Sequence, residues 1–385
     1  SRGLGDVYKR QKLWQFPAIV LLILEQTPVA RIMQKKRRIL QHVQIVKNQG
    51  FLTEFADFVD TMQSEVSSRK KVNPKLRIAV DLLGGEVSPE AWLHSLTKVR
   101  FPCPVDIYLF ISRKTKLTIP SVPHIRFFPV KASTISMEDS PRIVRTKINS
   151  SIVQGICALE KNDIDGFLST GNTGAIVAAA SLYMTKFSEI TRPALLAFLP
   201  TKKQPLAIID VGANVDCPPN RIISFARLGI AAQQALGITN PKVALLNVGS
   251  EKYKGSKDLQ SCYRLLEKFP NFSGNVEGNS LFEGNIDLLV TNGFTGNIIL
   301  KSTEGFANFI LGVLKKNIAT YKLFPDTFID GAILTGISGM VMKCHGNSTT
   351  ATITNAIDHF LKLIKKDFFI KYKEAYQKNF FPHIA

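Results

Sequence analysis

Short apolar runs separated by polar or glycine-rich turns dominate the chain from Lys75 onward, and this alternation restricts the fold more than any other feature of the sequence. The runs are LRIAVDLLGG, VDIYLFI, IRFFPV, DGFLSTGNTG, RPALLAFLP, PLAIIDVGANVD, KVALLNVGS and IDLLVTNGFTGN. Their apolar parts are rich in Ile, Leu and Val without strict alternation, which is typical of strands covered on both faces. Because helical periodicity follows the runs, the sequence predicts an α/β fold with a doubly wound, mostly parallel sheet.

Small and polar residues follow these runs, at the points where we expect the strands to end. They are Asp81, Gly84 and Gly85, then Gly171–Gly174, Asp210–Asp216, Asn247 and Gly249, and Asn292–Asn297. In an open α/β sheet, ligands bind outside the carboxyl ends of the strands. We therefore expect these turns to meet at one edge of the sheet and to form one binding site.

The segment FLSTGNTGAIVAAASLYM, at 167–184, is the most informative of these turns. A strand, a glycine-rich turn and the first turn of a helix together present free N–H groups and a partial positive charge, which favour an anion. The alternative is an ordinary strand-to-helix turn in which Asn172 or Thr173 caps the helix.

Cations accompany the turns in PRIVRTKINSS, SEKYKG and MKCHG. A pocket of amides and cations suits a reaction in which bound inorganic phosphate attacks a carbonyl, because phosphate is already nucleophilic and needs only placement and oxyanion stabilisation. Other signatures are missing: the sequence has no G-x-S-x-G elbow, no G-x-G-x-x-G, and no phosphate loop, since GSEKYKGSK has the wrong spacing. We expect phosphate to bind at the turn beginning at Ser169, with help from Arg142, Arg145 or Lys147.

Neither a metal nor a cofactor is expected. The six histidines are never paired at metal-ligand spacing. Asp81, Asp210 and Asp216 could hold a magnesium ion, but carboxylates in turns more often cap helices or brace loops. The five cysteines are far apart, which suits a reducing cytosol, and the apolar run FPAIVLLILEQ is too short to span a bilayer. We therefore expect a soluble, cytoplasmic protein.

The chain divides into four segments. GDVYKRQ resembles the translation of a transposon-end adaptor used in sequencing libraries, so residues 1–11 are interpreted as an artefact and 12–74 as an N-terminal extension of uncertain status. Residues 75–365 form the expected catalytic domain, and 366–385 a basic helical tail. The net charge of +19 favours an acidic partner or an anionic surface.

Taken together, the motifs resemble the PlsX family of acyl-[acyl carrier protein]:phosphate acyltransferases. The resemblance covers about Leu76 to Phe360 and rests on the order and spacing of AVDLLGGEVSP, PRIVRTKINSS, STGNTGA, ITRPALLAFLPT, DVGANVDCPP, LLNVGSEKYKG, FSGNVEG, TNGFTGN, LKSTEG and MKCHGNS. The sequence departs from the family pattern at Glu86, Thr146, Ile148 and Asn292.

The resemblance implies an α/β/α domain of the isopropylmalate-dehydrogenase-like type. It also implies transfer of a long-chain acyl group from acyl carrier protein to inorganic phosphate, giving acyl phosphate for phospholipid synthesis. The implied assembly is a homodimer that associates peripherally with the membrane and works with a downstream glycerol-3-phosphate acyltransferase. The acidity of acyl carrier proteins gives the positive charge a partner.

By motif, the family's catalytic Lys and Asn correspond to Lys254 and Asn297. The residues expected to bind phosphate or the acyl substrate are Gly84, Gly85, Arg142, Arg145, Lys147, Ser169, Gly171, Asn172, Thr173, Gly174, Asp210, Asn214, Asn247, Gly293, Thr295, Lys343 and His345.

Three alternatives remain open. Phosphate acetyl- and butyryltransferases catalyse related chemistry with coenzyme A thioesters. A nucleic-acid binder is motivated only by charge, and the sequence lacks the aromatic and basic motifs of the usual modules, so no nucleic acid is expected. A basic, non-catalytic scaffold at the membrane surface is the third. The proposed membrane role depends on apolar residues that recur near helical spacing, namely Phe306, Phe309, Ile310, Val313 and Leu314, before Lys315 and Lys316. Such a pattern suits a helix that lies on lipid, a dimer interface or a core helix.

Overall fold

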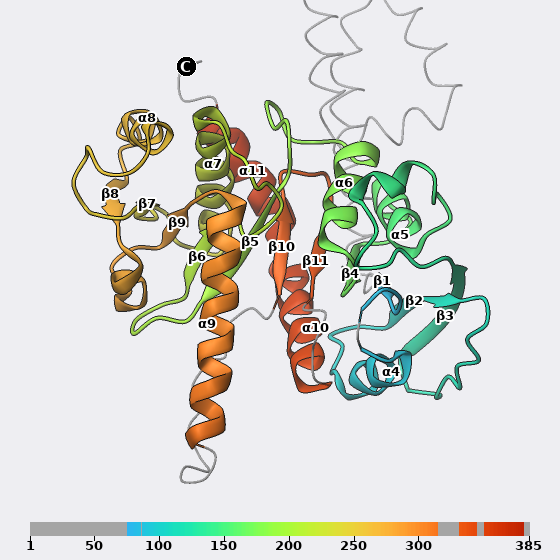
Figure 1. The fold of residues 1–385 in the computed structure, drawn as a ribbon. Coiled ribbons are helices and arrows are strands. Elements are labelled where there is room, and N and C mark those ends of the chain that lie inside the picture. The colour runs from blue at the N-terminus through green and yellow to red at the C-terminus, as the bar shows by residue number, and fades with distance from the viewer. Residues whose placement is uncertain (1–74, 86, 315–330, 345–349, 381–385) are drawn as a thin grey trace, which may run out of the picture. The chain divides into compact units, whose positions relative to one another are not determined.

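The computed structural model describes residues 75–85, 87–314, 331–344 and 350–380 (Figure 1). Contacts divide the chain into Ser1–Pro74 and Lys75–Ala385, and all described residues belong to the second unit. The predicted artefact at 1–11, the extension at 12–74 and the last residues of the predicted tail, 381–385, lie outside the described residues.

A mixed sheet forms the centre of this unit. Its strands are β1 (Leu76–Asp81), β2 (Val105–Ser112), β3 (Ile125–Ala132), β4 (Gly166–Ser169), β5 (Ala194–Leu199), β6 (Leu206–Ile209), β7 (Val243–Leu246), β8 (Phe272–Val276), β9 (Leu288–Val290), β10 (Ala332–Thr335) and β11 (Val341–Lys343). All eight predicted runs are strands, whereas β8, β10 and β11 were not predicted.

Helices cover both faces of the sheet. They are α4 (Pro89–Lys98), η1 (Pro141–Arg145), α5 (Ser151–Glu160), α6 (Thr173–Tyr183), α7 (Pro219–Ala235), α8 (Lys257–Leu266), η2 (Gly278–Glu283), α9 (Gly293–Leu314), α10 (Thr350–Lys365) and α11 (Phe368–Phe380). The predicted domain boundary at 365 falls between α10 and α11, and α11 packs against α7.

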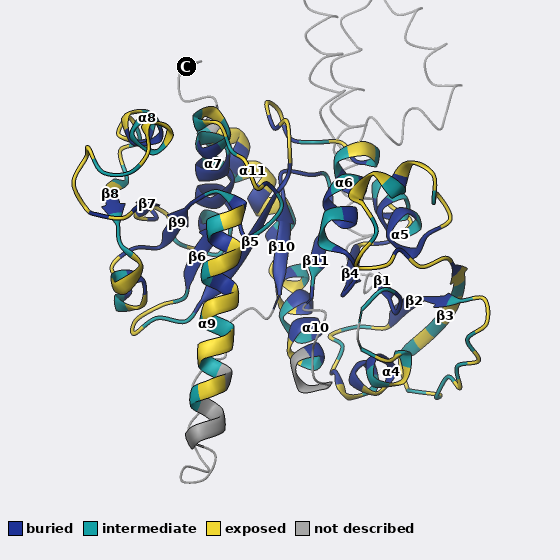
Figure 2. Ribbon diagram, in the orientation of Figure 1, coloured by how far each residue is buried: buried dark blue, intermediate teal, exposed yellow. Residues whose placement is uncertain are grey.

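Two apolar cores lie on opposite faces of the sheet. Successive side chains of a strand point to opposite faces, and accordingly Ile78 and Val80 of β1 belong to one core while Ala79 belongs to the other. The first core includes residues of α4, α7, α8, α10 and α11, and the second includes residues of α5, α6 and α9. Figure 2 shows the buried strands between helices whose outer faces are exposed. The predicted doubly wound α/β/α class is confirmed.

The strand order is β3-β2-β1-β4-β11-β10-β5-β6-β9-β7-β8. Seven of the pairings are parallel, but β11–β10, β10–β5 and β5–β6 are antiparallel. These three consecutive reversals mean that β6, β7 and β9 run opposite to β1 and β4. The expectation that all the polar turns meet at one edge of the sheet is therefore wrong: the turns after β1 and β4 lie at one edge, and those after β6, β7 and β9 lie at the other.

Candidate active site

The turn that follows β4 is braced by a buried carboxylate. Asp81, at the end of β1, accepts hydrogen bonds from the Leu83 N–H at 2.9 Å and from the Ser169 hydroxyl at 2.7 Å. The Ser169 oxygen in turn accepts from the Gly171 N–H at 3.0 Å. Burial raises the pKa of Asp81 to about 6, although its hydrogen bonds oppose this shift. Asp81 and Ser169 therefore fix the shape of the turn.

Gly84 and Gly85 allow the turn after β1 to approach the turn after β4. Gly84 has a φ of 79°, in the left-handed region that glycine adopts readily. A Cβ atom at Gly85 would lie 2.2 Å from the Thr170 Oγ1 atom, so no larger residue fits without displacing one of the turns. Both glycines, expected to bind substrate, thus have a clear role in packing.

Asn172 caps α6, as one alternative from the sequence proposes. Its Oδ1 accepts from the Ala175 N–H at 3.0 Å, and its amide nitrogen donates to the carbonyls of Ser136, Met137 and Asp139. The side chain is thereby occupied with protein partners. The first-turn N–H groups of Thr173 and Gly174 have no acceptor within the helix, and they remain the donors that an anion could use.

A cavity of about 490 Å³ adjoins the start of α6. Gly174 lines it, together with Arg142 and Arg145 of η1, Arg192 just before β5, and Ala213 in the turn after β6. The structure thus places two of the three predicted phosphate-binding cations beside the predicted anion site. Since Ala213 and Gly174 follow strands that run in opposite directions, the cavity also joins the two sets of turns across one face of the sheet.

Lys147, the third predicted cation, has a protein partner. Its ammonium group lies 2.9 Å from the Asp139 carboxylate and donates to the Thr134 carbonyl at 3.4 Å. The hydrogen bond from Lys147 holds the pKa of Asp139 below its usual value. The charge of Lys147 is therefore largely balanced by Asp139, unlike the charges of Arg142 and Arg145, which form no ion pair with any described residue.

Lys343 is a half-buried cation at the end of β11, on the same side as the α6 turn. Its ammonium group donates to the carbonyls of Thr170, at 3.3 Å, and Cys344. Burial lowers the pKa of Lys343 to about 8. The neighbouring Thr170 hydroxyl is buried without a hydrogen-bond partner among the described residues. His345 lies outside the described residues.

A second buried carboxylate braces the turn after β6. Asp210 accepts from the backbone N–H groups of Leu195, Ala213 and Asn214, at 2.9, 3.1 and 2.7 Å, and from the Asn214 side chain at 2.9 Å. Burial raises its pKa. The Asn214 carbonyl accepts from the Gly293 N–H at 2.8 Å, which ties this turn to the start of α9. Asp210 and Asn214 therefore position backbone at the opposite edge of the sheet.

Asn297 lies one turn into α9 and close to the β6 turn. The Asn292 side chain accepts from the Thr295 N–H at 2.8 Å at the start of the helix. A Cβ atom at Gly212 would lie 3.5 Å from the Asn297 Oδ1 atom. Because Gly212 adjoins Ala213, which lines the cavity, the Asn297 amide lies next to the Ala213 end of that cavity.

Lys254 lies in the loop after β7. β7 and β9 are neighbouring parallel strands, so Lys254 and α9 extend from the same edge of the sheet. The Asn247 amide donates to the Lys254 carbonyl at 3.0 Å and holds the loop. The Lys254 ammonium group lies 4.0 Å from Glu251 and 5.7 Å from the Tyr253 ring centre, and its side chain is 40% exposed. Lys254 is thus available to a ligand that approaches this edge.

Arg192 is not among the residues predicted from the sequence, although it stands in the motif ITRPALLAFLPT. Nothing in the local pattern indicates that Arg192 lines the same cavity as Gly174. A cation directly before the strand PALL was the sequence feature that could have drawn attention to Arg192. Only the fold shows which cavity it lines.

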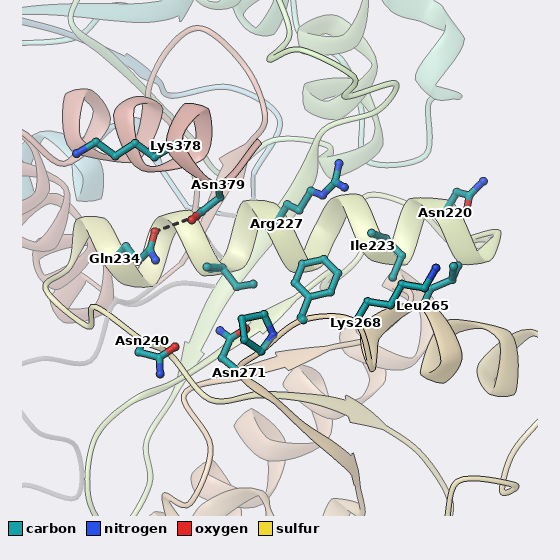
Figure 3. A pocket seen from close by; sticks show the side chains of 13 residues that line it. Asn220, Ile223, Arg227, Gln234, Asn240, Leu265, Lys268, Asn271, Lys378 and Asn379 are labelled. Carbon is teal, nitrogen blue, oxygen red and sulfur yellow. Dashed lines mark hydrogen bonds between the residues drawn. The ribbon is translucent and has the colours of Figure 1, made fainter. Parts of the chain in front are cut away.

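A larger cavity of about 620 Å³ lies beside α7 (Figure 3). Amide side chains, apolar residues and the cations Arg227, Lys268 and Lys378 line it, and Asn379 donates to Gln234 at 2.9 Å across one end. No predicted site residue is among those that line it, so it is a weaker candidate for the active site. The described residues contain no cluster of three potential metal ligands, and no helix among them is long and apolar enough to cross a membrane.

Comparisons with known proteins identify the family of this chain. The profile of the fatty acid synthesis protein family matches residues 76–371. The phosphate acyltransferase of Chlamydia pneumoniae is 35% identical over 299 residues, which cover 74% of this chain and 93% of the relative. The chain belongs to the PlsX phosphate acyltransferase family. The phosphate acyltransferase of Chlamydia abortus is also 35% identical, over 75% of this chain and 96% of the relative.

This membership confirms that the protein is an acyltransferase, and it confirms a role in fatty acid and phospholipid synthesis. Among solved structures, this chain has a fold similar to that of a phosphotransacetylase from Streptococcus pyogenes, with a TM-score of 0.51. That match has 13% sequence identity and covers 80% of this chain and 96% of the other.

Proposed function

We propose that this phosphate acyltransferase moves a long-chain acyl group from acyl-[acyl carrier protein] to inorganic phosphate and releases acyl phosphate. The observation that carries the proposal is the cavity that extends from the start of α6, past Arg142 and Arg145, to the turn beside Asn297. One end offers N–H groups and guanidinium groups for phosphate, and the other end lies beside an amide donor.

In the proposed reaction, inorganic phosphate binds at the turn that begins at Ser169, with Arg142 and Arg145 as its cations. A phosphate oxygen attacks the thioester carbonyl, and the Asn297 amide donates to the oxygen that gains negative charge. The carbon–sulfur bond then breaks, acyl phosphate forms, and the leaving thiolate takes a proton from solvent. Lys254 stabilises the thiolate as it leaves.

Mass spectrometry tests the proposal directly. Incubation with palmitoyl-acyl carrier protein and phosphate should yield palmitoyl phosphate, and Asn297→Ala should lower turnover by about 10²–10³-fold, the usual effect of losing one oxyanion donor. Lys254→Ala should lower turnover, and Lys254→Arg should not restore it fully, because a planar guanidinium does not replace a compact ammonium. Full acyl phosphate formation by folded Asn297→Ala and Lys254→Ala proteins would refute the catalytic roles.

The donor is tested in the same assay. Palmitoyl-coenzyme A replaces palmitoyl-acyl carrier protein at equal concentration, with the wild-type protein. A higher kcat/KM for the coenzyme A thioester would favour the phosphate acetyl- or butyryltransferase alternative. The net charge of +19 supports the acidic carrier protein, since complementary charge raises the rate of encounter.

Membrane association and a homodimer are also proposals, as is delivery of acyl phosphate to a glycerol-3-phosphate acyltransferase. The first two are supported by the outer face of α9, on which Phe306 and Phe309 are 66% and 64% exposed. Large apolar side chains at such exposure suit a lipid surface or a second protein better than a core helix. Of the other residues in that predicted pattern, Ile310 is half-buried, and Lys315 and Lys316 lie outside the described residues.

A further inference from the structure

The cavity beside α6 contains more positive charge than the sequence analysis expected. Arg142, Arg145 and Arg192 line it, and no acidic residue does. None of the three guanidinium groups forms an ion pair with a described residue. A planar guanidinium presents a fork of donors that matches two phosphate oxygens at once. Three of them around one cavity therefore indicate a ligand that carries phosphate.

The rest of the wall indicates that the ligand is larger than inorganic phosphate. Val144, Val177, Ala178 and Leu182 contribute apolar surface on the side of η1 and α6. Inorganic phosphate gains nothing from such a wall, whereas an organic chain does, because apolar surface removed from water is stabilising. The volume of about 490 Å³ is also within the range of roughly 300–1,000 Å³ that is typical of pockets for small organic molecules.

The position of Arg192 indicates the direction in which the organic chain of the ligand runs. Arg192 immediately precedes Pro193, whose carbonyl accepts from the Asn214 amide at 2.9 Å. Asn214 belongs to the same turn as Ala213, which lines the cavity, and Gly212, which adjoins Asn297. A phosphate held near Arg192 is thus next to the turn that leads to the proposed oxyanion donor.

We propose that Arg192 binds a phosphate group attached to an organic chain, while Arg142 and Arg145 hold inorganic phosphate at the α6 turn, and that the organic chain runs past Ala213 toward Asn297. The proposal rests on the proposed function and extends it, since the acyl donor and the product both have this chemistry. The donor's thiol arm carries a phosphodiester, and the product is a long-chain acyl phosphate. Arg192 is then a binding residue for the organic substrate in addition to the inorganic phosphate site at the α6 turn.

Isothermal titration calorimetry on the full chain tests this with four probes: 4′-phosphopantetheine, phosphate-free pantetheine, hexadecyl phosphonate and inorganic phosphate. Arg192→Gln should lower the affinity for one of the two organic phosphorus compounds by about tenfold or more, the usual effect of losing a charge-assisted hydrogen bond. It should leave the affinities for inorganic phosphate and pantetheine unchanged. Loss for 4′-phosphopantetheine identifies the donor arm as the ligand, and loss for the phosphonate identifies the product.

Two controls accompany the variant. Arg264→Gln removes an exposed arginine on α8 that donates to Ser261 and does not line the cavity, so it should bind all probes normally. Arg192→Lys keeps the charge without the fork and should recover only part of the affinity.

Equal weakening of inorganic phosphate and the organic probes by Arg192→Gln would overturn the inference, because the cavity would then be a simple anion site. Unchanged binding of all four probes would overturn it as well. These are binding measurements, so they are independent of turnover. Absence of acyl phosphate in the wild-type reaction would instead refute the proposed function.

Discussion

Replacing Gly296 by Ala tests whether the position of Asn297 matters for catalysis. A Cβ atom at Gly296 would lie 1.9 Å from the Asp210 carbonyl oxygen and 3.0 Å from the Thr291 side chain. Cβ atoms essentially never approach closer than 3.0 Å, so the first turn of α9 must move at least 1.1 Å away from Asp210. Asn297 is the next residue and moves with it.

The expected effect on turnover is large, because a misplacement of about 1 Å in a catalytic group can cost roughly 10²-fold in rate. We therefore expect the kcat of Gly296→Ala to fall by about 10²-fold, with the KM for phosphate little changed, since the arginines of the cavity are on other elements. Overpacking should also lower the free energy of unfolding by about 1–3 kcal/mol. Acyl phosphate formation followed by mass spectrometry, and urea denaturation, measure the two quantities.

Gly305 provides a matched control on the same helix. A Cβ atom there would have no neighbour within 4 Å, so Gly305→Ala should keep full activity and gain about 0.5–1 kcal/mol of stability from helix propensity. A Gly296→Ala protein with normal kcat would refute the argument, and so would an equal loss of kcat in Gly305→Ala.

Three further predictions concern charge and exposed surface. The KM for phosphate should rise as pH increases through about 8, because burial lowers the pKa of Lys343 to about 8 and the side chain is neutral above that pH. Lys343→Met should raise the KM at pH 7 and abolish its pH dependence. A wild-type KM that is flat between pH 7 and 9.5 would contradict a role for Lys343 in phosphate binding. Burial raises the pKa of Asp81 to about 6, so the folded state binds more protons than the unfolded state between about pH 4 and 6, and stability falls as pH rises. Relative to Asp81→Asn, the wild type should lose about 2 kcal/mol of unfolding free energy from pH 4 to 7. Denaturation curves with a constant difference would show that Asp81 does not titrate there. Replacing Phe306 and Phe309 by Glu should abolish co-sedimentation with anionic liposomes. Ile370→Glu, at an exposed position of α11, should not. If light scattering shows that the double variant is a monomer, the outer face of α9 is a dimer interface instead.

The strands of this protein could be predicted because each has enough local apolar sequence to be recognised alone. The strands that were missed are short or partly polar: β8 contains Gly274 and Asn275, and β10 and β11 have four and three residues. β10 and β11 nevertheless matter for the sheet, since they connect β4 to β5. The two antiparallel pairings of β10 cancel, and the β5–β6 pairing is the one that reverses the direction of the strands beyond it. Strand pairing is a long-range property, and no local pattern at β10 or β11 specifies it.

The turns show the same division between local and long-range information. The capping role of Asn172 follows from its own sequence neighbourhood, because the side chain reaches the N–H three residues later. The pairing of Lys147 with Asp139 also joins residues near in sequence, but it requires the intervening 3-10 helix to turn the chain back. The sequence presents Lys147 as a free cation, and the folded loop shows it balanced.

The sequence by itself determined the family, the α/β class and the chemical character of the turns, because all three depend on residue types at short, fixed spacings. Only the tertiary structure decided which turns share a cavity. Arg192 and Gly174 line the same cavity although Gly174 follows β4 and Arg192 precedes β5, a strand that runs in the same direction as β4, so the two residues lie beyond opposite ends of these strands. That meeting depends on the order and direction of strands distant in the sequence, and their packing fixes it only when the whole sheet has formed.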